Sequence, residues 1–236
     1  MNFIKICVVY INVSMFRAFF DLNPCLWPYD VKGVDNRLKN FGLPKIYNEL
    51  IESNIDANCW LFFVHEDFEI KESLLKINNL DVNCIYGTFG VRLENGVPIG
   101  YGSHVCSNKD GSNAVRVGLV VDSPMEVDSL DCQSVLVHTS LLKKHPVLRF
   151  DENLSFDLYA EEFCMKARFE LEIDVKVFDL DFQHYSHGNI TDRYHQGLVY
   201  LAGRYPDRAV AGSCSFIGGG AAELEKNFEY KIGAKK

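Results

Sequence analysis

The sequence predicts an α/β protein with a mostly parallel central sheet that is flanked by helices on both faces. Three observations lead to this fold class. Short apolar runs rich in Val, Ile, Phe and Cys recur along the chain, as in buried parallel strands. Segments with helical periodicity lie between these runs, which is typical of a parallel sheet covered on both sides. The composition, 47% hydrophobic and 24% charged over 236 residues, is that of an ordinary globular chain with a substantial core.

The individual elements follow from these runs. The predicted strands are residues 4–10, 59–64, 82–86, 114–121, 134–138 and 173–178. Helical spacing of apolar residues marks 45–54 and 159–171, and 71–77 is expected to form a shorter helix. The polar, glycine-rich segment 88–118 is predicted to form loops or a small hairpin, the kind of element that often covers a site.

No shift in composition marks a domain boundary, so one domain is predicted over residues 1–236. Residues 207–236 are expected to be a peripheral C-terminal extension, in which three glycines precede a helix. Asn12 and Arg17 interrupt the apolar N-terminal run, which also lacks the basic start and cleavage site of a signal peptide. No apolar stretch is long enough to cross a bilayer, so no transmembrane segment is expected.

Charge and cysteine usage narrow the class of partner and the compartment. The formal net charge is −8, and Lys and Arg are scattered, so nucleic-acid binding is not expected. The eight cysteines are widely spaced without a CxxC pair, which is typical of buried free thiols in a reducing compartment. These features predict a cytoplasmic protein, with the inner membrane surface as the alternative location.

The first candidate functional segment is WLFFVHEDFEI, residues 60–70. Its five leading apolar residues predict a buried strand that ends in His65, Glu66 and Asp67. Ligands of open α/β sheets bind beyond the carboxyl ends of the strands. A carboxylate at that point can hold Mg²⁺ or Mn²⁺ while phosphate and water fill the other coordination positions. Because strands usually end in polar residues, a loop without a metal is the alternative interpretation.

A second candidate segment is FDLDFQHYSHG, which contains His184 and His187. An imidazole nitrogen from either residue could complete a metal shell that Asp67 begins. Asp179 and Asp181 form a literal Asp-x-Asp pair and are rivals to Asp67, which we favour because it follows the more apolar strand. The HExxH arrangement of zinc proteases is absent. Surface histidines without a role are the alternative.

Three acids, Asp157, Glu161 and Glu162, cluster just before or within the first turn of the helix predicted at 159–171. Acids are favoured there by the helix dipole, so capping alone is one interpretation. In the other interpretation, one of the three is a general base that takes a proton from an acceptor hydroxyl. The residues alone do not choose among them.

In these stretches the chain resembles glycosyltransferases of the large family 2 type, whose Rossmann-like nucleotide-binding fold is called GT-A. It looks most similar to the bacterial branch whose metal motif reads His-x-Asp. Four segments carry the resemblance, and their order and spacing match the family between residues 3 and 195. The segments are GLPKIYNELIESN (42–54), WLFFVHEDFEI (60–70), VDSLDCQSVLVHTSLL (127–142) and FDENLSFDLYAEEFCMKARFELEIDVKVFDLDFQHYSHG (150–188).

The resemblance implies a role for each matching residue. It assigns a divalent metal, Mn²⁺ or Mg²⁺, to Asp67, with His184 as a metal or phosphate ligand and His187 as a second candidate. It assigns the catalytic acid of the helix to Glu162, where the sequence reads Glu-Glu instead of the common Glu-Asp. Glu161 and Asp157 are the other candidates for the base. Contacts with the donor nucleotide or its sugar are implied for Asn48, His65, Glu66 and Asp131.

The reaction implied by the resemblance is transfer of a sugar, with inversion, from a UDP- or GDP-linked donor to a hydroxyl of a carbohydrate or lipid-linked acceptor. Relatives of this type often build surface polysaccharides. A nucleotidyltransferase should carry a basic, glycine-rich loop after the first strand, and residues 10–28 contain none. Two further alternatives are a metal-dependent hydrolase that uses the same histidines and aspartate, and a degenerate, non-catalytic carbohydrate-binding module.

Overall fold

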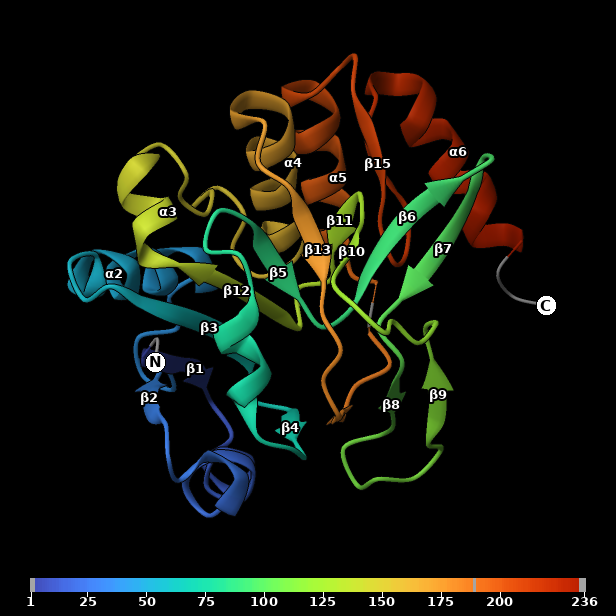
Figure 1. Cartoon of the computed structure of the whole chain (residues 1–236). Helices are drawn as coiled ribbons and strands as arrows, with labels where there is room; N and C mark the ends of the chain where they lie inside the picture. Colours follow the sequence, from blue (N-terminus) through green and yellow to red (C-terminus); the bar gives the residue numbers. More distant parts are fainter. Residues whose placement is uncertain (1–2, 189, 234–236) are drawn as a thin grey trace.

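Seven strands form a mixed central sheet in the computed structural model, which describes residues 3–188 and 190–233 (Figure 1). In spatial order these strands are β10 (Met125–Glu126), β13 (Val175–Val177), β5 (Ile85–Gly87), β12 (Ser134–His138), β3 (Cys59–His65), β1 (Phe3–Tyr10) and β2 (Asp30–Asp35). Strands β12 and β10 run antiparallel to their neighbours, while the other strands of this sheet run in one direction. The predicted α/β class with a mostly parallel central sheet is confirmed.

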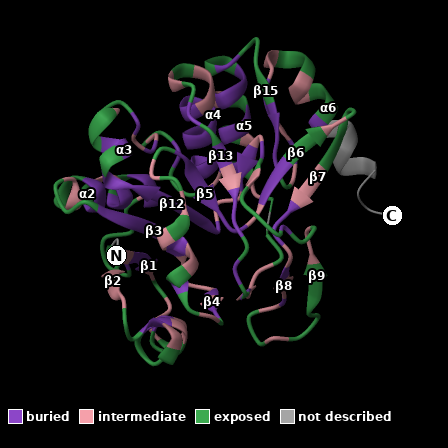
Figure 2. Ribbon diagram, viewed as in Figure 1, coloured by how far each residue is buried: buried purple, intermediate pink, exposed green. Residues whose placement is uncertain are grey.

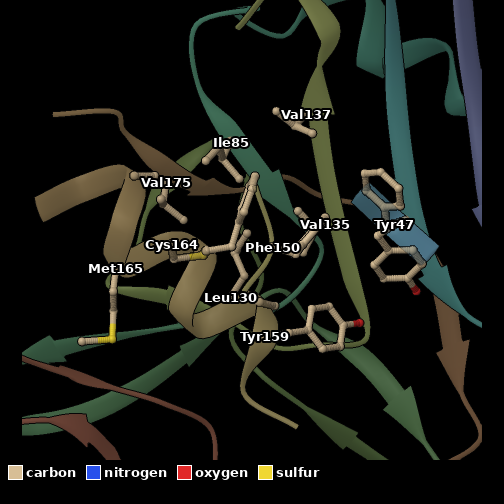
Figure 3. Close-up of a cluster of buried hydrophobic side chains, with 14 of the residues drawn as sticks. Tyr47, Ile85, Leu130, Val135, Val137, Phe150, Tyr159, Cys164, Met165 and Val175 are labelled. Carbon is tan, nitrogen blue, oxygen red and sulfur yellow. The ribbon is translucent and has the colours of Figure 1, made fainter. Parts of the chain in front are cut away.

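Alternate residues of β1 enter two apolar clusters, one on each face of the sheet. Cys7 and Val9 belong to the larger cluster, whose rings include Tyr47, Phe150 and Tyr159 (Figure 3). This cluster takes its helical residues from α2 (Leu43–Asn54), α3 (Thr139–Lys144), α4 (Tyr159–Leu171) and α5 (Asp192–Arg204). The strands of the central sheet are largely buried, whereas exposed residues lie on the outer helix surfaces and loops (Figure 2).

The opposite face of the sheet carries shorter helical segments. Ile6 and Val8 of β1 point to this side, where they join Phe16, Phe20 and Leu74 in the second cluster. The helices that contribute to it are α1 (Val13–Phe16), η1 (Arg17–Asp21), η2 (Pro24–Leu26) and η3 (Leu74–Asn79). Helices therefore lie on both faces of the sheet, with the long ones on one side.

Smaller sheets extend from the central one. They comprise β11 (Ser129–Leu130) with β6 (Gly90–Glu94) and β7 (Val97–Tyr101); β4 (Phe68–Ile70) with β14 (Phe182–His184), β8 (His104–Cys106) and β9 (Val115–Val117); and β15 (Ala209–Ala211) with β16 (Phe216–Gly218). Strands β6 and β7 form the hairpin predicted within 88–118, closed by Asn95 and Gly96, both with positive φ.

Two predicted elements differ from the structure. Only Val115–Val117 of the strand predicted at 114–121 is a strand, and it belongs to the four-stranded sheet. The helix predicted at 71–77 is a 3-10 helix that starts at Leu74, because the chain before it is still paired in a sheet. Lys71 N donates to Asp181 O over 2.9 Å and thereby continues the β4–β14 ladder.

The C-terminal segment packs on α5. Val210 of β15 and Ile217 of β16 belong to the larger cluster, and α6 (Gly220–Gly233) contacts both α5 and β16. Residues 234–236 of the predicted extension lie outside the described residues. All eight cysteines fall within the described part and are free thiols. None of the helices described for this chain has the length and apolar character needed to span a bilayer.

Candidate active site

A cavity of about 460 Å³ opens at the carboxyl ends of β1, β2 and β3. Val9 lies opposite His65 in the parallel register, and Asn36 N donates to Tyr10 O over 2.9 Å, so the segments that follow these strands begin side by side. Ligands of open α/β sheets bind in this position. The polar lining includes Asn36, Asn40, His65, Asp67, Lys109 and Arg193, with Phe41 and Phe156 as aromatic walls.

Three possible metal ligands meet beside this cavity. Atoms of His65, Asp67 and His184 that can bind a metal lie within 4.8 Å of one another. Asp67 lies in the two-residue turn between β3 and β4, whereas His184 ends β14. Pairing of β14 with β4 brings them together: His184 lies opposite Phe68, and Tyr185 N donates to Asp67 O over 2.8 Å. Pairing of β4 with β14, which are far apart in the chain, thus joins the two segments that the sequence singled out.

Asp67 and His184 place two unsatisfied polar atoms in this cluster. Oδ1 of Asp67 and Nε2 of His184 are buried and 3.3 Å apart, so they contact each other as an ion pair, but neither atom makes a hydrogen bond among the described residues. Buried polar atoms of this kind are rare and costly unless something satisfies them. A divalent ion would accept a lone pair from each, so the residues present fit such an ion.

The hydrogen bonds of His65 leave its other nitrogen free to bind an ion. The carbonyl of Cys132 can only accept, so the Tyr159 hydroxyl gives its hydrogen to that oxygen over 2.6 Å. His65 Nε2, 2.9 Å from the same hydroxyl oxygen, is therefore the donor of that contact. Burial lowers the pKa of His65, which favours the neutral ring. The lone pair of neutral His65 then lies on Nδ1.

Asp67 and His184 carry opposite charges within the cluster. Burial disfavours the imidazolium of His184, but contact with Asp67 and Cys106 outweighs burial and raises the pKa of His184 to about 10. Burial alone would raise the pKa of Asp67, yet its interactions with His184 and His65 bring it below the usual value. In the absence of a metal, Asp67 and His184 form a buried ion pair. A divalent ion would take the place of the His184 proton.

The acids of α4 differ in where they point. Glu161 Oε2 accepts a hydrogen bond from the Cys132 thiol over 3.0 Å, and burial, together with the charge of Asp131, raises the pKa of Glu161 to about 8. Asp131 and Asp157 each act electrostatically on both Glu161 and His65. Glu161 therefore lies in the same electrostatic neighbourhood as the histidine–aspartate cluster, although it does not line the cavity.

Glu162 lies in a different network. Its Oε1 accepts from the Tyr205 hydroxyl over 3.1 Å and lies 3.4 Å from Lys166 Nζ and 3.3 Å from Arg204 Nε. Its side chain is completely buried and is not part of the cavity lining. These contacts tie α4 to the end of α5, so Glu162 has a structural role in holding the two helices together.

Asp157 and Glu66 lie next to the cavity in fixed positions. Asp157 lines a second cavity of about 190 Å³, which shares Ser155 and Arg193 with the larger one, and its Oδ2 accepts from Arg193 Nε over 2.7 Å. Glu66 Oε2 accepts from the backbone N–H groups of Ile11 and Asn12 and so holds the loop that follows β1.

The remaining predicted residues lie farther from the cluster or have structural partners. Asn48 bonds both the N–H and the carbonyl of Phe150 and does not line the cavity. Asp131 accepts from Ser213 Oγ over 2.8 Å. His187 is exposed and is not one of the three clustered ligands. The rival residue Asp179 is paired with Lys76, away from the cavity.

Sequence reasoning missed several residues that line the cavity: Asn36, Asn40, Lys109, Phe156 and Arg193. Asn36 follows β2, a strand that was not predicted. Lys109 and Arg193 come from the glycine-rich segment and from α5, and nothing in their local sequence distinguishes them from other surface cations. Only the folded chain brings them to one cavity.

The sequence and the structure were compared with known proteins. No protein-family model matches the sequence, and no curated protein does. A solved structure with similarity to this chain is described as a glycosyltransferase involved in the glycosylation of the major capsid of PBCV-1. The match has 9% sequence identity and a TM-score of 0.41, and it covers 82% of this chain and 98% of that one.

Proposed function

We propose that this chain is a metal-dependent glycosyltransferase with a GT-A fold that transfers a sugar from a nucleoside diphosphate donor to an acceptor hydroxyl. One observation carries the proposal: Asp67 and His184 present two buried ligand atoms, paired only with each other and without a hydrogen bond, beside a large cavity at the carboxyl end of the sheet. Such a site suits a divalent ion that also binds a phosphate, because carboxylate and imidazole leave several coordination positions open.

The cavity has the chemistry to hold a nucleoside diphosphate. Lys109 and Arg193 supply positive charge for phosphate oxygens, and a guanidinium can bind two such oxygens at once. Phe156 stacks on the His65 ring at 5.4 Å and lies under the Arg193 guanidinium at 4.8 Å, so the aromatic wall contacts both the proposed metal ligand and the cation. Asn36 and Asn40 offer amide donors and acceptors of the kind that recognise a base or a ribose.

Asp67, His184 and His65 Nδ1 would hold the ion, which when bound supplies Lewis-acid stabilisation of the negative charge on the departing diphosphate. The same charge would be stabilised by Lys109 and by Arg193, whose side chain is held by Asp157 and Phe156. Glu66 orders the loop after β1 that forms one wall.

We assign the general base to Glu161, which would take the proton of the acceptor hydroxyl at a carboxylate oxygen. Because its pKa is raised to about 8, Glu161 holds a proton at neutral pH, so it would act as a base only in its ionised form, whose share grows as the pH approaches 8. The other two candidates are already engaged: Asp157 is paired with Arg193, and Glu162 with Lys166 and Arg204. Direct displacement by the acceptor would invert the anomeric centre, and the acceptor would be a carbohydrate or a lipid-linked sugar.

A metal-dependent hydrolase is the second candidate, because the histidine–aspartate cluster by itself could equally activate water. The two functions differ in what the large cavity binds. A transferase needs nucleotide affinity that depends on the metal, whereas a hydrolase of this kind needs none.

The test is release of nucleoside diphosphate from a panel of UDP- and GDP-linked sugars that depends on an added carbohydrate or lipid-linked acceptor, with Mn²⁺ or with a chelator. We expect release by the wild type with Mn²⁺, and a loss of at least about a hundredfold in Asp67→Ala. Asp179→Ala is the matched control, because Asp179 belongs to the rival Asp-x-Asp pair and lies outside the cavity. Equal release in the chelator or in Asp67→Ala would exclude the proposal.

A further inference from the structure

The four-stranded sheet gathers a second set of metal-ligating side chains beside the first. Strand β8 runs parallel to β14, with Cys106 opposite His184 in register. Side chains alternate along a strand, so His104 and Cys106 point to the same face. His104 Nε2 lies 3.2 Å from Cys106 Sγ, and ligand atoms of His104, Cys106 and His184 lie within 4.8 Å of one another.

His104 is held as metal-binding histidines are. Its side chain is buried, and Nδ1 lies 2.9 Å from the carbonyl oxygen of Gly102. Because a carbonyl only accepts, Nδ1 carries a hydrogen, and the lone pair of the neutral ring lies on Nε2, which faces Cys106. In metal sites a ligating imidazole usually donates a hydrogen bond from its other ring nitrogen, often to a backbone carbonyl. Stacking on Phe182 at 4.5 Å fixes the ring plane.

The donor atoms of this set differ from those at Asp67. A thiolate with two imidazoles is a soft set that favours Zn²⁺, whereas the carboxylate of Asp67 is a hard donor. Neither His104 nor Cys106 belongs to the Asp67 set, and only His184 is common to both. None of the roles assigned above to the proposed transferase uses His104 or Cys106.

We propose that His104, Cys106 and His184 form a site for a soft divalent cation of the Zn²⁺ class, distinct from the cluster at Asp67. Three protein ligands leave one position of a tetrahedral ion for water or another small ligand. The Cys106 thiol and the His184 imidazolium each give up a proton to solvent when the ion binds, so binding releases protons.

Titration with Co²⁺, a spectroscopic substitute for Zn²⁺, tests this site. Thiolate-bound Co²⁺ has a charge-transfer absorption that cobalt bound only by oxygen and nitrogen lacks. We expect the wild type to develop this absorption and Zn²⁺ to abolish it by displacement. We expect Cys106→Ser and His104→Ala to lose it. Cys25→Ser is the matched control, since Cys25 is another partly buried free thiol and should leave the spectrum unchanged.

Circular dichroism of each variant without metal establishes that it is folded, and Cys106→Ala replaces Cys106→Ser if the latter is not. Asp67→Ala should keep the thiolate absorption, because Asp67 is not a ligand of this site. Cobalt binding without the absorption, or an absorption that survives in Cys106→Ser, would overturn the proposal, as would its loss in Asp67→Ala. Nucleotide binding plays no part in the readout, so the outcome is independent of the proposed transferase.

Discussion

At the scale of single residues, Glu161 and Glu162 are neighbours on α4 with different surroundings. Successive residues of a helix point about 100° apart, so one carboxylate reaches the Cys132 thiol and the other reaches Tyr205. Burial raises the pKa of both. For Glu162, Lys166 and Arg204 act in the opposite direction, whereas the nearby charge of Asp131 adds to the effect of burial on Glu161.

The raised pKa of Glu161 predicts a pH-dependent stability. Between its usual value of 4.5 and about 8, folded Glu161 holds a proton that the unfolded chain has released. The free energy of unfolding should therefore fall as pH rises through this window, by up to about 1.4 kcal/mol per pH unit from this group. The glutamine of Glu161→Gln cannot titrate, so the free energy of unfolding of the variant should decline less steeply from pH 5 to about 8. Urea unfolding at a series of pH values measures this decline in both proteins.

An equal pH dependence in wild type and Glu161→Gln would contradict the buried, protonated state of this side chain. Asp56→Asn is the matched control, because the Asp56 side chain is 79% exposed and should leave the slope unchanged.

At the scale of elements, the turn before β8 depends on Gly102. This glycine has φ of +98°, and a Cβ built there would lie 1.9 Å from the carbonyl oxygen of Thr88. Its own carbonyl oxygen contacts His104 Nδ1. A side chain at this position would therefore meet both backbone strain and a clash with backbone, next to the histidine of the proposed soft-metal site.

We expect Gly102→Ala to lower the free energy of unfolding by about 3 kcal/mol or more, from strain and clash together. Gly96→Ala is the control, because Gly96 has φ of +82° with no atom within 4 Å of the added Cβ. The control should lose only about 1 kcal/mol from strain. Urea unfolding of the two variants measures the difference, and equal losses would contradict the close contact at Thr88.

Much of the element pattern was predictable from local sequence. The strand at 134–138 and the helix at 159–171 agree with β12 and α4, because their apolar runs and spacing match their burial. Strand β2 escaped prediction since its charged, half-buried sequence becomes a strand only by pairing with β1 at the sheet edge. Helix α5 was not among the predicted helices, although its sequence carries helix signals. Thr191 caps it, and Tyr194, Leu198 and Leu201 share a buried face.

At the scale of the whole molecule, the site depends on segments far apart in the chain. His65 and Asp67 could be singled out because they follow an apolar run, and His184 because another histidine follows it three residues later. That these three meet depends on pairing of β14 with β4, which no local pattern specifies. The separation of Glu161 from Glu162 could not be predicted either, because it depends on which of them meets α5.

The distribution of charge makes a further prediction at this scale. The chain carries a net charge of −8, so a diphosphate needs local cations to bind. Arg193 and Lys109 are the cations that line the large cavity among the described residues. We expect Arg193→Ala to weaken nucleoside diphosphate binding roughly tenfold, the loss of about one charged hydrogen bond.

Lys143→Ala is the control for Arg193→Ala, because Lys143 pairs with Asp56 on the surface and does not line the cavity. Titration calorimetry with UDP or GDP compares the two variants. Unaltered affinity in Arg193→Ala would mean that the nucleotide does not occupy the large cavity.

Metal-dependent nucleotide binding at Asp67 is the most direct test of the proposed function. Calorimetric titration of wild type and Asp67→Ala with UDP and GDP, with and without Mn²⁺, measures it. We expect one nucleotide to bind the wild type only with Mn²⁺, and Asp67→Ala to lose that binding, because Asp67 Oδ1 is one of the two unsatisfied ligand atoms. Binding that needs no metal or persists in Asp67→Ala would contradict the proposed site, and metal binding without either nucleotide would favour the hydrolase.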